Sequence, residues 1–158
     1  MKLFENPELR RLLPFPIARA VDILMAEIEE SGAETTADET VNLIESTLCH
    51  LGRLWVAEYL ELASCKEDAV SADLNEQIFE RVSQGKPVLI GQWVALARAI
   101  RGYFEKHGYQ TVIEGLADVD FGTPGDSSHP VSRLTSFRNQ FSHGSFKAVL
   151  REIDEHRG

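Results

Sequence analysis

The chain has 158 residues, of which 43% are hydrophobic and 26% are charged, and its formal net charge is −9. This length suits one domain with a sizeable core, and the apolar fraction excludes a chain that is disordered throughout. No apolar run approaches the roughly 20 residues that a membrane-spanning helix needs, and the first residues lack the apolar stretch of a signal peptide. We therefore predict one soluble, cytoplasmic domain over residues 1–158, with the alternative that it is the N-terminal domain of a longer protein.

The first residues predict an extended opening followed by one helix. Pro14 and Pro16 favour extended chain, because proline restricts its own backbone and that of the residue before it. From Pro16 onward apolar residues recur at helical spacing as far as about Glu30, and Ser31-Gly32 is a typical stop signal. Residues 33–37 are mostly polar, so we predict a short link there.

The longest predicted helix spans about Asp38 to Cys65. Its apolar stripe recurs in steps of three and four, and Glu58 is the one acidic member of that stripe. Cys49 and Cys65 both lie on this helix, at a separation of roughly 24 Å for a rise of about 1.5 Å per residue. A disulfide requires Cα atoms within about 7 Å, so we predict two free thiols.

Two further helices are predicted before a long loop. One starts near Asp73, with Ser71 or Asp73 as its N-cap, and ends near Gly85. The other begins after Pro87 and ends at His107-Gly108.

Residues 118–130 contain two glycines and two prolines and are predicted to form a loop. Within it, Ser127-Ser128-His129 is typical of a turn rather than of a nucleophile. A last helix is predicted from about Val131 to His156, with Gly144 as a point where it can bend or divide. Since no strand pattern competes anywhere, we predict an all-α antiparallel bundle of about five helices.

Charge is spread unevenly along the chain. Residues 31–80 carry 11 acidic and 2 basic side chains, whereas residues 81–117 carry 5 basic and 2 acidic ones. Residues 129–158 carry 5 basic and 3 acidic side chains. A partner that bears phosphate is therefore expected to contact the C-terminal half. The alternatives are that the acidic face is simply solvated, or that it binds a basic partner that no motif identifies.

One polar segment stands out, Ser136-Phe137-Arg138-Asn139-Gln140-Phe141-Ser142-His143-Gly144. On a helix its two phenylalanines would point to the core, and Asn139 and His143 would share another face. Arg138 and His143 would lie about 140° apart on an ideal helix of roughly 3.6 residues per turn. One regular helix cannot aim both at one small target, so either the helix is distorted or a second subunit completes the site.

This segment resembles the signature of the HEPN superfamily, in which an arginine is followed after four to six residues by a histidine. A polar residue usually follows the arginine directly, and the matching positions here are Arg138, Asn139 and His143. The chain length, the order of the helices and the preceding loop fit the same family. The resemblance implies a HEPN-like bundle, a homodimer, and metal-independent RNA cleavage without a cofactor.

In that family the arginine would hold the scissile phosphate, and the histidine would handle the proton of the 2′-OH or of the leaving oxygen. Asn139 would orient either group. Glu45 on the long helix is either an accessory polar residue that faces the motif or a solvated helix glutamate. HEPN toxins paired with nucleotidyltransferase antitoxins often carry a tyrosine two residues after the histidine. Ser145 stands at that position here, which argues against regulation at such a tyrosine.

The resemblance therefore predicts a dimeric endoribonuclease that acts on RNA, in a bacterial defence or toxin system. The alternative is a non-catalytic HEPN-like dimerisation or regulatory module. In that case Arg138 pairs with a carboxylate, Asn139 caps a helix, and His143 bonds to a backbone carbonyl. A regulatory protein partner is compatible with both hypotheses.

Overall fold

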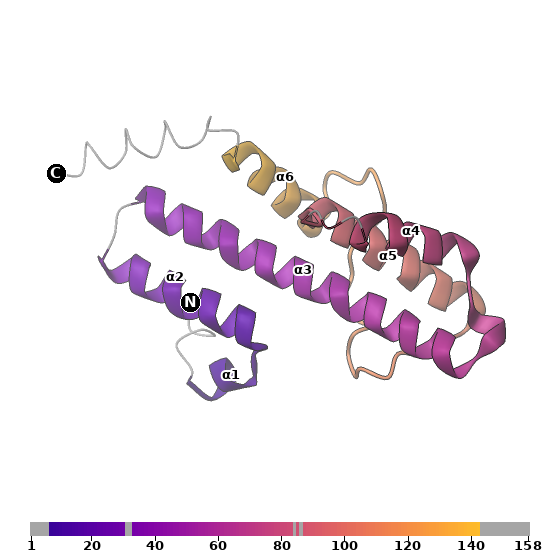
Figure 1. Ribbon diagram of the computed structural model, residues 1–158. Coiled ribbons are helices and arrows are strands. Elements are labelled where there is room, and N and C mark those ends of the chain that lie inside the picture. Colours follow the sequence, from indigo (N-terminus) through magenta and orange to yellow (C-terminus); the bar gives the residue numbers. More distant parts are fainter. Residues whose placement is uncertain (1–6, 31–32, 84, 86, 143–158) are drawn as a thin grey trace. The chain divides into compact units, whose positions relative to one another are not determined.

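The computed structural model describes residues 7–30, 33–83, 85 and 87–142, and the regular secondary structure within them is entirely helical (Figure 1). This confirms the predicted all-α class. The elements are α1 (Pro7–Leu12), α2 (Phe15–Glu30), α3 (Ala33–Cys65), the 3₁₀ turn η1 (Glu67–Ala69), α4 (Ala72–Val82), α5 (Ile90–His107) and α6 (Pro130–Ser142).

The chain forms two compact units. Residues 1–47 and 136–158 make up unit 1, and residues 48–135 make up unit 2. The single domain over residues 1–158 stays a prediction. In the described part of the chain, no helix combines the length and the apolar character that crossing a membrane would require.

Residues 7–12 are helical, which corrects the prediction that the segment before Pro14 is extended. Pro7 is the first residue of α1, where its missing N–H costs nothing. Arg11 lies 3.2 Å from the carboxylate of Glu8, one turn earlier on the same helix. Pro14 lies between α1 and α2, and its carbonyl accepts the N–H of Ile17 at 2.9 Å at the start of α2.

Unit 1 has a small apolar core. Its buried side chains come from α2 and from the first half of α3: Ile17, Ala20, Val21, Leu24 and Val41. Helix α3 starts at Ala33, so the short link predicted over 33–37 is helical instead. That stretch contains neither proline nor glycine, and its alanines and glutamate are good helix formers.

The core of unit 2 lies between the second half of α3 and α5. Trp55 and Phe104 pack edge to face, with ring centroids 5.6 Å apart. Gly52 allows the two helices to approach closely, because a Cβ there would lie 2.8 Å from the Cβ of Trp93. Cys49 and Cys65 are not joined by a disulfide, as predicted.

The ends of α4 and α5 follow the sequence signals. The Ser71 hydroxyl caps α4 by accepting the N–H of Leu74 at 3.3 Å. Gly108 ends α5 with a left-handed φ of 68°. Tyr59 is fully buried, and its hydroxyl accepts the N–H of Ser71 and lies 2.9 Å from Asn75 Oδ1.

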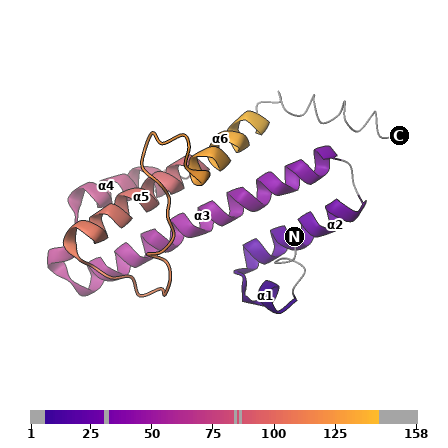
Figure 2. The same cartoon turned by 180° about the vertical axis from the view of Figure 1, so that it is seen from behind.

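Residues 108–129 form the long segment that connects α5 to α6, and Figure 2 shows it in orange, passing across α3 and α5. Glu58 on α3 is 4% exposed and accepts two backbone N–H groups of this segment, from Val112 at 2.8 Å and from Ile113 at 2.6 Å. The loop predicted over 118–130 is confirmed up to Pro130, where α6 begins. The predicted continuation of the last helix to His156 lies outside the described residues.

Candidate functional site

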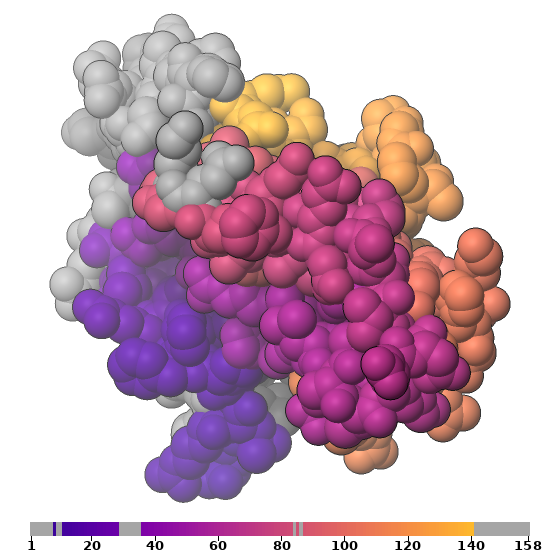
Figure 3. All heavy atoms as spheres, turned by 45° about the vertical axis from the view of Figure 1, so that its right-hand side comes forward, coloured from indigo at the N-terminus to yellow at the C-terminus, as the bar shows by residue number. Residues whose placement is uncertain are grey.

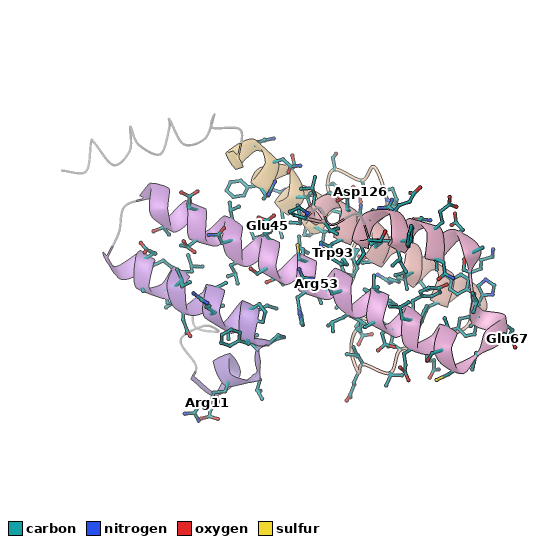
Figure 4. All side chains as sticks on the ribbon, viewed as in Figure 1. Arg11, Glu45, Arg53, Glu67, Trp93 and Asp126 are labelled. Carbon is teal, nitrogen blue, oxygen red and sulfur yellow. The ribbon has the colours of Figure 1, made fainter. Side chains whose placement is uncertain are left out.

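The predicted arginine of the motif forms an ion pair with the long helix. Arg138 on α6 places Nη2 2.8 Å from Oε1 of Glu45 on α3, and both residues belong to unit 1. The side chains are 23% and 33% exposed, so the pair is half-buried. Figure 4 labels Glu45 on the side of α3 that faces α6. Glu45 therefore faces Arg138, and its role as an accessory residue of the motif stays a prediction.

The rest of the Arg138 guanidinium is only partly satisfied. Its Nη1 lies 3.5 Å from Oδ1 of the neighbouring Asn139, which is the outer limit of a hydrogen bond. Its Nε is buried and has no hydrogen-bond partner among the described residues. A buried donor without an acceptor costs free energy. A guanidinium has five N–H donors, and these contacts use only some of them.

Two of the three predicted site residues can be placed. Asn139 is exposed and lies well inside α6, so it does not cap the start of that helix. His143 lies outside the described residues, so whether it approaches Arg138 stays a prediction. Phe137, predicted to point to the core, is half-buried.

Two arginines of α5 hold the long loop of unit 2, and sequence reasoning assigned them no role. Arg98 donates twice to the carbonyl of Phe121, from Nε at 3.0 Å and from Nη2 at 2.6 Å, and Nη2 also reaches Ser132 Oγ at 3.2 Å. Arg101 donates from Nη1 to the carbonyl of Val119 at 3.0 Å. Backbone carbonyls of an irregular segment need donors, and these two guanidinium groups supply them.

Asp120 and His129 close the same loop. Nε2 of His129 lies 3.2 Å from Oδ2 of Asp120, and Nδ1 accepts the N–H of Val131 at 3.2 Å in the first turn of α6. This network assigns the ring proton to Nε2. Two hydrogen bonds hold the pKa of Asp120 below its usual range. The larger effect comes from the N–H of Gly122, and the next from the His129 ring. Gly122 has a φ of 67°, and a side chain there would collide with the His129 ring.

This arrangement lines an open cavity of about 410 Å³ in unit 2, bordered by Arg98, Arg101, Asp120 and His129. Both ring nitrogens of His129 are engaged in bonds that shape the loop. The hydroxyl of Ser128 lies 2.6 Å from Oδ1 of Asp126, and this bond lowers the pKa of that carboxyl. The contacts of Ser128 and His129 lie within the loop and the first turn of α6, and they confirm the prediction that Ser127-Ser128-His129 forms a turn.

In the described part of the chain, no three His, Cys, Asp or Glu side chains are grouped so that they could hold a metal ion. Comparison of the chain with protein-family models, with curated protein sequences and with solved structures finds no match.

Proposed function

We propose that this chain binds RNA through Arg138 and cleaves it as a homodimeric, metal-independent endoribonuclease of the HEPN type. The observation that carries the proposal is the Arg138–Glu45 pair, in which one guanidinium nitrogen is fixed at 2.8 Å by a carboxylate on another helix. Because guanidinium is a rigid planar fork, fixing Nη2 also fixes the direction in which the remaining donors point. Nη1, beside Asn139, is the donor that would bind a phosphate oxygen.

The proposed reaction is a transesterification of the RNA backbone. His143 accepts the 2′-OH proton, the 2′ oxygen attacks phosphorus, and the bond from phosphorus to the 5′ oxygen breaks. The products are a 2′,3′-cyclic phosphate and a 5′-hydroxyl, whose proton comes from an imidazolium. Arg138 stabilises the charge that develops on the phosphate oxygens. Since Arg138 and His143 diverge by about 140° on a regular helix, each protomer would supply one of them to a shared site.

A non-catalytic interaction module is the second candidate, and the same ion pair favours it. A carboxylate at 2.8 Å compensates the charge of Arg138, as in an arginine whose role is to hold two helices together. In this case Arg138 and Glu45 contribute to stability, and neither contacts a nucleic acid.

The decisive experiment measures cleavage of structured and unstructured RNAs by the purified chain in EDTA. Arg138→Ala and His143→Ala are compared with Arg133→Ala, which removes an exposed arginine earlier on α6 and serves as the matched control. Circular dichroism checks that each variant is folded. We expect the wild type and R133A to cleave, R138A and H143A to lose at least about a hundredfold in rate, and the products to end in cyclic phosphate.

Absence of cleavage by the folded wild type on every RNA would favour the interaction module. Cleavage that persists in both R138A and H143A would show that this motif is not the site. The dimer is tested separately by sedimentation equilibrium, and mixing R138A with H143A tests the shared site. If each protomer supplies one residue, the mixed dimer regains one intact site and part of the activity.

A further inference from the structure

A solvent-open apolar groove lies between the end of α3 and α4, away from the loop of unit 2 that the arginines hold. It has a volume of about 570 Å³ and is lined mainly by Leu60, Ile78, Phe79 and Val82. Phe79 is 70% exposed, Leu60 50% and Val82 47%. Figure 3 turns toward the viewer the face on which α4 and the end of α3 lie next to each other. Contiguous apolar surface of this kind typically marks an interaction site.

One edge of this groove is negatively charged. Asp73, Glu76 and Glu80 follow one another at spacings of three and four along α4, so they share a side of the helix. All three are exposed, and Glu76 itself lines the groove. The one basic residue of α4, Arg81, is half-buried, and its Nη1 donates back to the carbonyl of Gln77 at 2.9 Å. The edge beside the apolar floor is therefore acidic.

The apolar floor and the acidic edge of the groove together indicate which kind of partner would fit it. A helix with an apolar face can bury that face in the groove, as amphipathic helices do in grooves between paired helices. Lysine or arginine beside that apolar face would meet the carboxylates of α4. A second copy of the same face would bring carboxylates against carboxylates, which disfavours self-association here. We propose that this groove binds a basic amphipathic helix of a partner protein.

The test uses a defined probe, a fluorescein-labelled Leu/Lys amphipathic peptide of about 18 residues, and measures its anisotropy with the full chain. A Leu/Glu peptide of identical apolar pattern controls for charge. Phe79→Ala is compared with Val112→Ala, because Val112 is 81% exposed and does not line the groove. The double variant E76Q/E80Q is compared with E114Q/D118N, which removes the same charge from exposed positions of the loop.

We expect the Leu/Lys peptide to bind and the Leu/Glu peptide to bind at least about tenfold more weakly. F79A should weaken binding by about tenfold and E76Q/E80Q several-fold, whereas the two control variants should leave it unchanged. Amide chemical shifts should change at residues 60, 79 and 82. Equal binding by F79A and V112A, or shifts confined to other parts of the chain, would overturn the proposal. Sedimentation that shows self-association abolished by F79A would overturn it too, because the occupant would then be a second copy.

Discussion

Nη2 of Arg138 and Oε1 of Glu45 lie 2.8 Å apart, although 93 positions of sequence separate the two residues. The pair joins α6 to α3 within unit 1 and fixes the guanidinium of the residue that the proposed ribonuclease would use. The two candidate functions give this contact different meanings. As a positioning contact it should affect catalysis more than stability, and as a structural contact it should affect stability alone.

A double-mutant cycle of Glu45→Gln and Arg138→Gln separates these meanings. The pair is half-buried and still in contact with water, so we expect a coupling free energy of about 0.5–1 kcal/mol, near the upper end for ion pairs that water screens. Urea unfolding of the four proteins measures it. If the pair positions a catalytic arginine, E45Q should also lower the RNA cleavage rate by more than this energy accounts for, with KM little changed. A coupling energy near zero would show that the contact does not contribute to stability.

The approach of α3 to α5 at Gly52 gives a second prediction. Gly52→Ala places a Cβ 2.8 Å from the Cβ of Trp93 and 2.9 Å from its carbonyl oxygen, so the helices must separate. We expect a loss of about 1–3 kcal/mol in the free energy of unfolding. Gly102→Ala on α5 is the matched control, because nothing lies within 4 Å of its Cβ, and it should stabilise by about 0.5–1 kcal/mol. Equal effects of the two substitutions would contradict the close approach.

Helical periodicity and end signals predicted most of the fold. Ser71, one of the two predicted N-cap candidates with Asp73, caps α4, and the predicted stop at Gly108 ends α5. Each signal depends on one residue and its immediate neighbours. The errors fell where local signals conflict. Pro14 suggested extended chain before it, yet α1 ends at Leu12, before that proline acts. The polar side chains over 33–37 predict a link, but α3 starts at Ala33 because the helix propensity of that stretch is good.

The candidate site could be predicted from the sequence only where the spacing of its residues forms a recognisable motif. The spacing of Arg138, Asn139 and His143 indicated a motif, and Glu45 was a candidate because it lies on the long helix. The roles of Arg98 and Arg101 could not be found in this way, since their partners are backbone carbonyls of a loop. Any residue type presents a carbonyl, so the sequence carries no signal for which arginine binds it.

Glu58 gives a third prediction, because its buried carboxylate is the anchor of residues 112 and 113. Glu58→Gln replaces one acceptor oxygen with an NH₂ group that faces a backbone N–H, at a cost of about 1–3 kcal/mol in the free energy of unfolding. Hydrogen exchange should show that the amides of Val112 and Ile113 lose protection. Glu61→Gln, at an exposed position on the same helix, is the control and should change stability by less than about 0.5 kcal/mol. Unchanged protection in E58Q would contradict the anchoring role.

The loop of Asp120 should loosen in acid. Hydrogen bonds from the N–H of Gly122 and, with a smaller effect, from the His129 ring stabilise the charged carboxylate. They hold the pKa of Asp120 below its ordinary value of 3.8. Because the pKa is lower in the folded state, the charged carboxylate contributes its full stabilisation when the pH is above the ordinary pKa. The stabilisation is then lost as the pH falls from 3.8 through the lower folded value. In Asp120→Asn the contribution is absent, so urea unfolding between about pH 5 and pH 2 should show a shallower loss of stability than in the wild type. Identical pH profiles for the two proteins would mean that Asp120 does not hold the loop through its charge.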